Sequence, residues 1–341
     1  MRLVKTEDAV GQVLCHDITR IIKDIEKGAI FSKGHIITEE DIPVLLNIGK
    51  DHIYILENDE TKLHENDAAK MLRDICLGPN MRATEPKEGK IEIIAECDGL
   101  FLVDLNRLKT INSLTNMMIA TRPSGFPVKA GDKLCGTRII PLMIENERME
   151  QAKQVAGSLP LLSLVPIRPK KYGLITTGNE IFYGRIKDDF SPVVKSKLAE
   201  YGCEIIAHCI LGDDDAIITS TIRAMLDDGA ELVLCTGGMS VDPDDRTPKA
   251  IRNSGVNVVA YGAPVLPGAM FLLSYTKDNR PVCGLPGCVM YSKRTIFDIL
   301  LPYLLADVPV STDQLAALGN GGLCLNCENC HYPNCGFGKG A

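Results

Sequence analysis

Tryptophan is absent from this sequence, and all aromatic residues together make up only 5% of its 341 residues. The core of the protein is therefore expected to consist of isoleucine, leucine, valine, alanine and methionine. An apolar fraction of 45% and a charged fraction of 24% are typical of an ordinary folded protein. A chain of this length is expected to form two or three domains.

The sequence also lacks an excess of positive charge and a long apolar run. A formal net charge of −7 argues against nucleic acid as the main partner, because no broad basic surface is available to release counterions. The longest apolar run, residues 299–306, is too short to cross a bilayer. We therefore expect no membrane-spanning helix and no membrane among the partners. Residues 1–8 lack the apolar stretch of a signal peptide. We therefore expect a cytoplasmic protein.

Three common catalytic motifs are missing as well. The sequence contains no G-x-S-x-G nucleophile elbow, no Walker A loop and no H-E-x-x-H zinc motif. Hydrolase and ATPase activities of these kinds are therefore not indicated.

Changes in the hydrophobic pattern divide the chain into four expected parts. Residues 1–60 form a small α+β region, and residues 61–165 form a β-rich subdomain with a linker helix. In residues 166–308, short apolar strands alternate with helices, which predicts an α/β domain with a doubly wound, mostly parallel sheet. Residues 309–341 form a cysteine-rich tail. Ligands of doubly wound sheets bind beyond the carboxyl ends of the strands.

Three glycine-rich loops follow strands of the expected α/β domain, at residues 176–180, 236–245 and 283–288. Paired glycines at a strand end let backbone amides turn towards an anion. Nearby threonine and serine hydroxyls can add donors, and carboxylates can hold a magnesium ion that neutralises phosphate. Each loop alone is most simply a tight turn next to a helix cap. Three such loops on one sheet edge favour a phosphate-bearing ligand.

Four motifs in this half of the chain resemble the successive signatures of the molybdopterin-binding domain. They are Thr177-Gly178-Asn179-Glu180, Thr236-Gly237-Gly238-Met239-Ser240 with Asp245, Leu266-Pro267-Gly268 and Gly284-Leu285-Pro286-Gly287. That domain occurs in gephyrin, in molybdopterin molybdenumtransferases and adenylyltransferases, and in the CinA proteins. The resemblance implies binding of molybdopterin, as the pterin phosphate or its adenylylated form, with magnesium.

The resemblance and the loops together give two sets of candidate residues. The cofactor-binding candidates are Thr176, Thr177, Gly178, Thr236, Gly237, Gly238, Ser240, Pro267, Gly268, Pro286 and Gly287. The catalytic candidates are the acidic residues Glu180, Asp242 and Asp245.

The chain departs from the family's pattern at four places. Asn179 stands where the family usually has an acid, and Asp242 replaces an expected glycine. Ala269-Met270 follows the proline-glycine motif where lysine is common, and Cys288-Val289 replaces a typical Asn-Pro. These changes weaken the case for metal-assisted phosphoryl chemistry and leave the case for binding nearly intact.

Four of the thirteen cysteines lie close together near the C-terminus, in the spacing C-x2-C-x2-C-x4-C. They are Cys324, Cys327, Cys330 and Cys335. Closely spaced cysteines of this kind favour an iron–sulfur cluster. Structural zinc ranks second, because it more often uses two separated C-x2-C pairs. A disordered tail of free thiols is the third interpretation.

Three functions are compatible with these observations. The first is a protein that binds molybdopterin in molybdenum cofactor biosynthesis, maturation or delivery to an apo-molybdoenzyme. The second is an enzyme of the molybdopterin molybdenumtransferase type. The third is a metal-responsive or redox-responsive regulator in which the cysteine tail is primary. The family resemblance also suggests a homo-oligomer.

Overall fold

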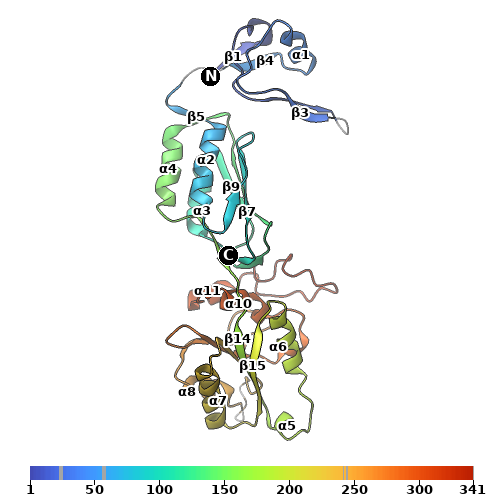
Figure 1. The fold of residues 1–341 in the computed structure, drawn as a ribbon, viewed down its shortest axis with the longest axis vertical. Helices are drawn as coiled ribbons and strands as arrows, with labels where there is room; N and C mark the ends of the chain where they lie inside the picture. The colour runs from blue at the N-terminus through green and yellow to red at the C-terminus, as the bar shows by residue number, and fades with distance from the viewer. Residues whose placement is uncertain (23–25, 56–58, 241, 243–244, 341) are drawn as a thin grey trace. The chain divides into compact units, whose positions relative to one another are not determined.

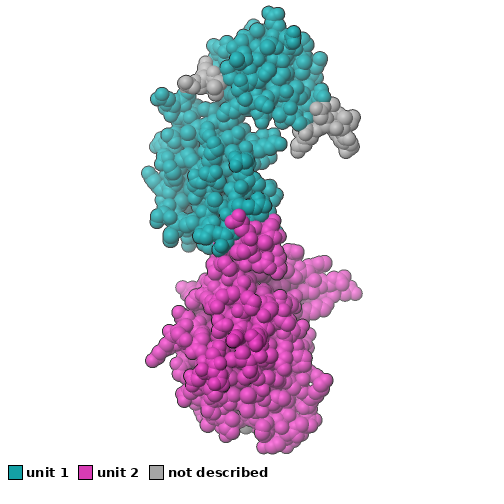
Figure 2. Space-filling view, in the orientation of Figure 1, with its two compact units in different colours: residues 1–94, 104–122, 133–163 teal, residues 95–103, 123–132, 164–341 magenta. Residues whose placement is uncertain are grey.

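The computed structural model describes residues 1–22, 26–55, 59–240, 242 and 245–340. The chain forms two compact units (Figure 2), and each is built from separate stretches of sequence. Unit 1 holds residues 1–94, 104–122 and 133–163, and unit 2 holds residues 95–103, 123–132 and 164–341. The division into four parts that the sequence suggests stays a prediction. The two units divide the chain differently, because residues 95–103 and 123–132 group with unit 2.

The first part of unit 1 is a small α+β arrangement. Its strands pair antiparallel, β1 (Arg2–Lys5) with β4 (His52–Ile55) and β2 (Ile18–Ile22) with β3 (Glu26–Phe31). A 3-10 turn, η1 (Thr6–Asp8), and one helix, α1 (Asp41–Asn47), complete it. Its core is made of apolar side chains from these elements and the turns between them: Ala9, Leu14, Ile18, Phe31, Ile37, Leu45 and Ile53.

The rest of unit 1 is an antiparallel sheet with helices. The strands lie in the order β6 (Met81–Ala83), β7 (Lys90–Ala95), β11 (Lys133–Ile139) and β9 (Met117–Thr121). The helices are α2 (Glu65–Cys76), α3 (Leu105–Asn112) and α4 (Asn146–Ala156), and β5 (Lys62–His64) pairs with β12 (Met143–Glu145). Helix α2 buries its apolar side, including Leu72 and Ile75, as its helical period requires.

Unit 2 contains a six-stranded sheet in the order β15-β14-β16-β19-β18-β17. These strands are β14 (Lys171–Thr177), β15 (Glu204–Leu211), β16 (Leu232–Thr236), β17 (Asn257–Tyr261), β18 (Leu272–Tyr275) and β19 (Pro281–Leu285). Strands β15, β14, β16 and β19 are parallel to their neighbours in this series, whereas β18 is antiparallel to both β19 and β17. The expected α/β class is confirmed for this part of the chain.

Helices cover both faces of this sheet (Figure 1). Helices α6 (Phe190–Ala199) and α10 (Ile296–Leu305) pack on the face that carries Leu174, and α7 (Asp215–Asp227) and α8 (Thr247–Asn253) pack on the face that carries Ile175. Because successive side chains of a strand point to opposite faces, a central strand covered on both sides must be apolar throughout. Strand β16 is buried throughout and is apolar from Leu232 to Cys235, with Thr236 as its only polar residue.

Smaller elements complete unit 2. They are α5 (Asn179–Phe182), α9 (Cys288–Tyr291), α11 (Thr312–Ala317) and a three-stranded sheet in the order β10 (Phe126–Val128), β8 (Gly99–Val103) and β13 (Leu162–Pro166). Among the described residues, no helix has the length and apolar character needed to span a membrane.

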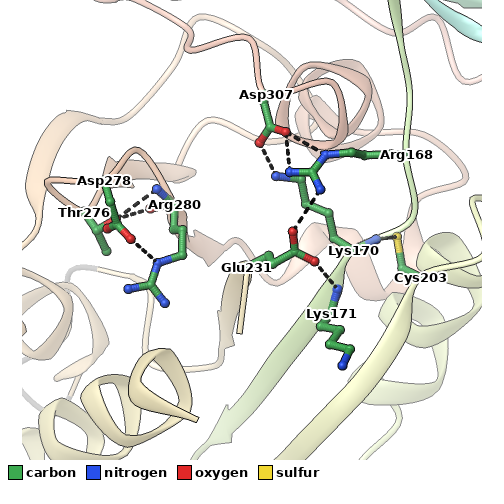
Figure 3. A network of polar contacts seen from close by, with 9 residues as sticks. All are labelled: Arg168, Lys170, Lys171, Cys203, Glu231, Thr276, Asp278, Arg280 and Asp307. Atoms are coloured by element: carbon green, nitrogen blue, oxygen red, sulfur yellow. Dashed lines mark hydrogen bonds and ion pairs between the residues drawn. The ribbon is translucent and has the colours of Figure 1, made fainter. Parts of the chain in front are cut away.

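A network of charged side chains closes the amino end of the six-stranded sheet (Figure 3). Lys170, whose side chain is 2% exposed, forms an ion pair with Asp307. Arg168 donates two hydrogen bonds, of 2.9 and 2.7 Å, to the Asp307 carboxylate and lies 3.2 Å from Glu231. Glu231 in turn accepts a 3.0 Å hydrogen bond from the backbone of Lys171. The network therefore joins the beginnings of β14 and β16 to the end of α10.

Candidate functional site

The carboxyl ends of the central parallel strands lie side by side. Thr236 of β16 pairs in register with Thr176 of β14 and with Leu285 of β19. Strand β18 runs the other way, so its first residue, Leu272, lies opposite Gly284 at the same edge. The three glycine-rich loops therefore meet at one edge of the sheet, as the alternating strand and helix pattern predicts. The Leu266-Pro267-Gly268 motif comes near the same edge because β18 is antiparallel.

The loop after β16 passes very close to the end of β14. Gly237 has φ +83°, and a Cβ at this position would collide with the carbonyl oxygen of Thr177. Gly238 has φ +53°, and its Cβ would lie 3.0 Å from the hydroxyl of Thr247 at the start of α8. Only glycine combines this left-handed backbone with so close an approach. The paired glycines therefore fix the direction in which the loop leaves the sheet.

This loop and the loop after β19 line a cavity of about 510 Å³. Seven of the sequence candidates lie in its wall: Gly237, Gly238, Ser240, Asp242, Asp245, Pro286 and Gly287. None of its described lining residues is a lysine or an arginine. The charged groups in the cavity wall are thus carboxylates alone.

The two aspartates of the cavity are close to each other in the loop. The backbone N–H of Asp245 donates to the carbonyl of Asp242 at 3.0 Å, and the N–H of Asp242 lies 3.3 Å from the Asp245 carboxylate. Within the described residues, neither aspartate forms an ion pair with a lysine or arginine. Glu180, the third acidic candidate, is exposed on α5 and is not part of the cavity wall.

Three candidate threonines are turned into the protein. Thr176, Thr177 and Thr236 are each at most 1% exposed and do not line the cavity. The Thr177 hydroxyl donates to the carbonyl of Thr236 at 3.2 Å and accepts from the Thr247 hydroxyl, 3.0 Å away. Their hydroxyls therefore tie the strand ends together.

The Thr176 hydroxyl belongs to a polar cluster that the sequence analysis missed. Ser191 Oγ lies 2.8 Å from Thr176 Oγ1 and 2.9 Å from His208 Nε2, and it donates to the carboxylate of Asp188. The Lys195 ammonium, which only donates, lies 3.2 Å from His208 Nδ1. Neutral His208 must then carry its proton on Nε2 and donate it to Ser191.

The ionisation of this cluster follows from its contacts. Burial lowers the pKa of His208, and the nearby Lys195 charge lowers it further. Burial acts to raise the pKa of Asp188, but hydrogen bonds from Ser191 and from the backbone of Phe190 outweigh it, so the Asp188 pKa is lowered. Neutral His208 beside ionised Asp188 is therefore the state expected near neutral pH. The sequence signal for this cluster was the run Asp188-Asp189-Phe190-Ser191 at the start of a helix.

Pro267 and Gly268 do not line the cavity and instead contact the start of α10. The carbonyl of Pro267 accepts a 3.1 Å hydrogen bond from Ile296 at the start of α10, and a Cβ on Gly268, which has φ +133°, would collide with the Ile296 side chain. The next two residues, Ala269 and Met270, line the cavity instead.

Several residues of the cavity wall were not among the candidates. They are Met239, Ala269, Met270, Cys288, Met290 and Tyr291. Ala269, Met270 and Cys288 are positions where the sequence departs from the family's pattern, which was the signal available for finding them. Burial raises the pKa of the Cys288 thiol.

The four tail cysteines do not converge on one point. Among residues 1–22, 26–55, 59–240, 242 and 245–340, no three histidine, cysteine, aspartate or glutamate side chains are grouped so that they could hold a metal ion. All four thiols are free, with Cys324 and Cys335 half-buried and Cys327 and Cys330 exposed.

Two parts of the chain match known protein families. Residues 173–306 match a family model described as a probable molybdopterin binding domain, which confirms the resemblance drawn from the glycine motifs. Residues 3–57 match a domain of unknown function, DUF8806.

Among curated proteins, the chain is similar to a molybdopterin molybdenumtransferase of Synechococcus elongatus. The two are 26% identical over 196 residues, which cover 54% of this chain and 46% of that protein. A CinA-like protein of Mycobacterium tuberculosis is 33% identical over 79 residues, or 23% of this chain and 18% of that protein. The chain therefore spans less than half the length of these relatives.

Two solved structures are matched over most of their own length. One is the molybdopterin biosynthesis enzyme MoaB of Thermus thermophilus, 21% identical, with 40% of this chain and 91% of that chain covered and a TM-score of 0.33. Another is the CinA protein, of unknown function, of Thermoplasma acidophilum, 19% identical, with 35% and 89% covered and a TM-score of 0.31.

Proposed function

We propose that the domain formed by residues 173–306 binds molybdopterin in molybdenum cofactor biosynthesis. The ligand would be the pterin phosphate or its adenylylated form. One observation carries the proposal: the glycine loop after β16 and the loop after β19 line an open cavity of about 510 Å³ at the carboxyl edge of the sheet. This is the edge at which doubly wound sheets bind their ligands. The protein would act in the maturation of the cofactor or in its delivery to an apo-molybdoenzyme. It would do so as a homo-oligomer.

The phosphate end of the ligand would lie against the glycine loop. The backbone at Gly237 and Gly238 carries no side chain that would keep an anion away, so amide N–H groups can approach it directly. The wall has no lysine or arginine among its described residues, so the negative charge of a phosphate must be balanced by another group.

Magnesium fits this requirement. It is usually held by one or two carboxylates, by phosphate oxygens of the ligand and by water. Asp242 and Asp245 supply the two carboxylates in the cavity wall. A magnesium ion held there would neutralise the phosphate charge.

The pterin ring would contact the apolar side of the cavity. Met239, Met270 and Met290 line it together with Tyr291. Methionine side chains adapt to an irregular ligand surface, and a tyrosine ring can stack on a flat heterocycle.

A transferase of the molybdopterin molybdenumtransferase type is the second candidate. It is favoured by two acidic candidates, Asp242 and Asp245, in the cavity wall. The exposed position of Glu180 outside that wall makes binding the first choice. If Glu180→Ala restored an apo-molybdoenzyme to full activity, as wild type would, Glu180 would have no catalytic role and the transferase candidate would lose its third acid.

Calorimetry under argon tests binding directly. Purified protein is titrated with molybdopterin and with its adenylylated form, each with and without magnesium. We expect saturable binding that strengthens with magnesium and weakens in an Asp242→Asn, Asp245→Asn double variant. Asp278→Asn, at the opposite end of the sheet where Asp278 pairs with Arg280, is the matched control. No heat of binding with either ligand would contradict the proposal.

A further inference from the structure

The cysteine-rich tail is folded onto the α/β domain. Leu323 forms a parallel bridge with Leu266, in which Leu266 N–H donates to Gly322 and Cys324 N–H donates to Leu266, both at 2.8 Å. Farther along, Gly338 N–H donates to the carbonyl of Gly321 at 2.9 Å. The segment that carries the four cysteines is therefore a loop closed at both ends.

An aromatic anchor holds the middle of this loop. The Tyr332 hydroxyl donates to the carbonyl of Asp298 at 3.1 Å, and the Arg294 guanidinium lies 5.3 Å from the centre of the Tyr332 ring. The ring also lies 6.0 Å from that of Phe126 and 6.2 Å from that of Phe337, which is buried. These contacts fix the backbone between Cys330 and Cys335. The disordered-tail interpretation is thus not what the structure describes.

All four cysteines of the loop face the same cavity. Cys324, Cys327, Cys330 and Cys335 line a space of about 790 Å³, larger than the cavity at the glycine loops. Nothing about the pterin proposal requires this second space. The folded loop thus places four free thiols around one cavity, where they could bind a metal ion or a metal cluster.

The spacing of the cysteines and the arrangement of their thiols favour one occupant over another. A single zinc ion needs its sulfur ligands to meet around one point, each about 2.3 Å from the metal. In the part of the chain that the structure describes, no three such ligands meet in this way. A cube of iron and sulfide is larger, and each of its four irons takes a thiolate from a different direction. Four thiols that line one cavity without meeting at a point, in the spacing C-x2-C-x2-C-x4-C, suit the cube better than the single ion.

The positive charge at the cavity also favours an iron–sulfur cluster. A cluster ligated by four thiolates is anionic, and Lys293 and Arg294 both line the cavity. Lys293 also donates a 2.6 Å hydrogen bond to the carbonyl of Glu328, between the second and third cysteines. A positive charge is thereby held beside the loop that would carry the negative one.

We propose that Cys324, Cys327, Cys330 and Cys335 ligate a [4Fe–4S] cluster in this cavity. Four iron–sulfur bonds form, and the four thiol protons leave to solvent. Tyr291 lines both this cavity and the cavity at the glycine loops, so the cluster would lie next to the proposed pterin site. The cluster proposal depends on the tail alone and does not rest on pterin binding.

The test is metal analysis of the full chain after purification under argon and reconstitution with sulfide and equal amounts of ferrous and ferric iron. We expect about four irons and four acid-labile sulfides per chain, together with an electron paramagnetic resonance signal after reduction by dithionite. One zinc per chain with no iron, or no bound metal at all, would overturn the proposal.

Two variants locate the cluster. Cys327→Ser with Cys330→Ser removes two exposed ligands, so we expect loss of bound iron without loss of the folded circular dichroism spectrum. Cys97→Ser, a half-buried cysteine that does not line the cavity, is the matched control and keeps its iron. Iron retained in the double variant would overturn the assignment. Because pterin binding is measured separately by calorimetry, its failure leaves these results interpretable.

Discussion

The two ends of the six-stranded sheet use charge in opposite ways. At the amino end, Lys170 and Arg168 meet Asp307, and Arg168 also meets Glu231 (Figure 3). At the carboxyl end, Asp242 and Asp245 form no ion pair with a described lysine or arginine. The described residues of the cavity wall include no lysine and no arginine. Charges that are already paired hold the fold together, whereas carboxylates left beside a cavity can take a cation and its anionic ligand. This difference supports the proposal that the carboxyl end binds the ligand, while the amino end stabilises the fold.

Among the variants that test the comparison between the two ends of the sheet, Gly237→Ala is expected to have the largest effect. The new Cβ would collide with the Thr177 carbonyl in a left-handed backbone, so we expect a loss of about 3 kcal/mol in unfolding free energy, together with loss of pterin binding. Urea denaturation and calorimetry measure the two effects. Gly255→Ala is the control, because Gly255 has φ +93° with no atom within 4 Å of the added Cβ. There we expect about 1 kcal/mol from the backbone alone, and equal losses in the two variants would mean that the close approach does not matter.

The next largest effect is expected at the amino end. Asp307→Asn leaves the Lys170 ammonium buried without its charge partner. A fully buried pair broken in this way costs about 3–5 kcal/mol, and we expect roughly 2 kcal/mol here because the Asp307 side chain is 47% exposed. Urea denaturation measures the loss. Molybdopterin affinity should be unchanged, and a large fall in affinity would show that the two ends of the sheet are not separate.

A smaller effect is expected at the carboxyl end. In the presence of magnesium, Asp242→Asn with Asp245→Asn should weaken pterin binding about tenfold, or roughly 1.4 kcal/mol. The unfolding free energy should stay close to that of wild type, since neither carboxylate forms an ion pair with a described residue. A double variant that binds as tightly as wild type but unfolds more easily would reverse the roles assigned to the two ends.

The smallest effect is a pH dependence of the His208 cluster. Since the pKa of His208 is lowered in the folded protein, protonation favours the unfolded chain. The stability contributed by neutral His208 is complete above its unfolded pKa, about 6.5, and is lost as the pH falls towards the lower folded value. Lys195→Met removes one cause of the lowering, so its unfolding free energy should fall less than that of wild type between pH 7.5 and 5.5. An identical pH profile in both proteins would mean that Lys195 does not act on His208.

Much of the α/β domain could be predicted from the sequence. Strands such as β16 are apolar on both faces, and helices such as α7 begin at an acidic cap, where the Asp214 side chain accepts from two backbone N–H groups. These are local features, and local patterns predict them. That the three glycine-rich loops share one edge followed from the parallel direction of β14, β16 and β19.

The orientation of the threonines could not be predicted. In a sheet buried on both faces, alternation does not distinguish inside from outside, so Thr176 and Thr177 both looked available to a ligand. Packing of α6 on one face and α8 on the other decides their hydrogen-bond partners, Ser191 and Thr247. Likewise, no local pattern indicates that residues 123–132 belong with the α/β domain, because that grouping depends on contacts between distant parts of the chain.

The close approach of Gly237 to Thr177 also has a consequence for affinity. Gly237 and Gly238 lie against the strand end, so this part of the loop has few conformations to lose when a ligand arrives, and little ordering entropy of these residues opposes binding. The packing of Met239 against Gly284, where a Cβ would lie 2.5 Å from its sulfur, limits the same loop from the other side. The free energy that orders residues 237–239 is thus supplied during folding, and the binding free energy of a ligand is not needed to order them.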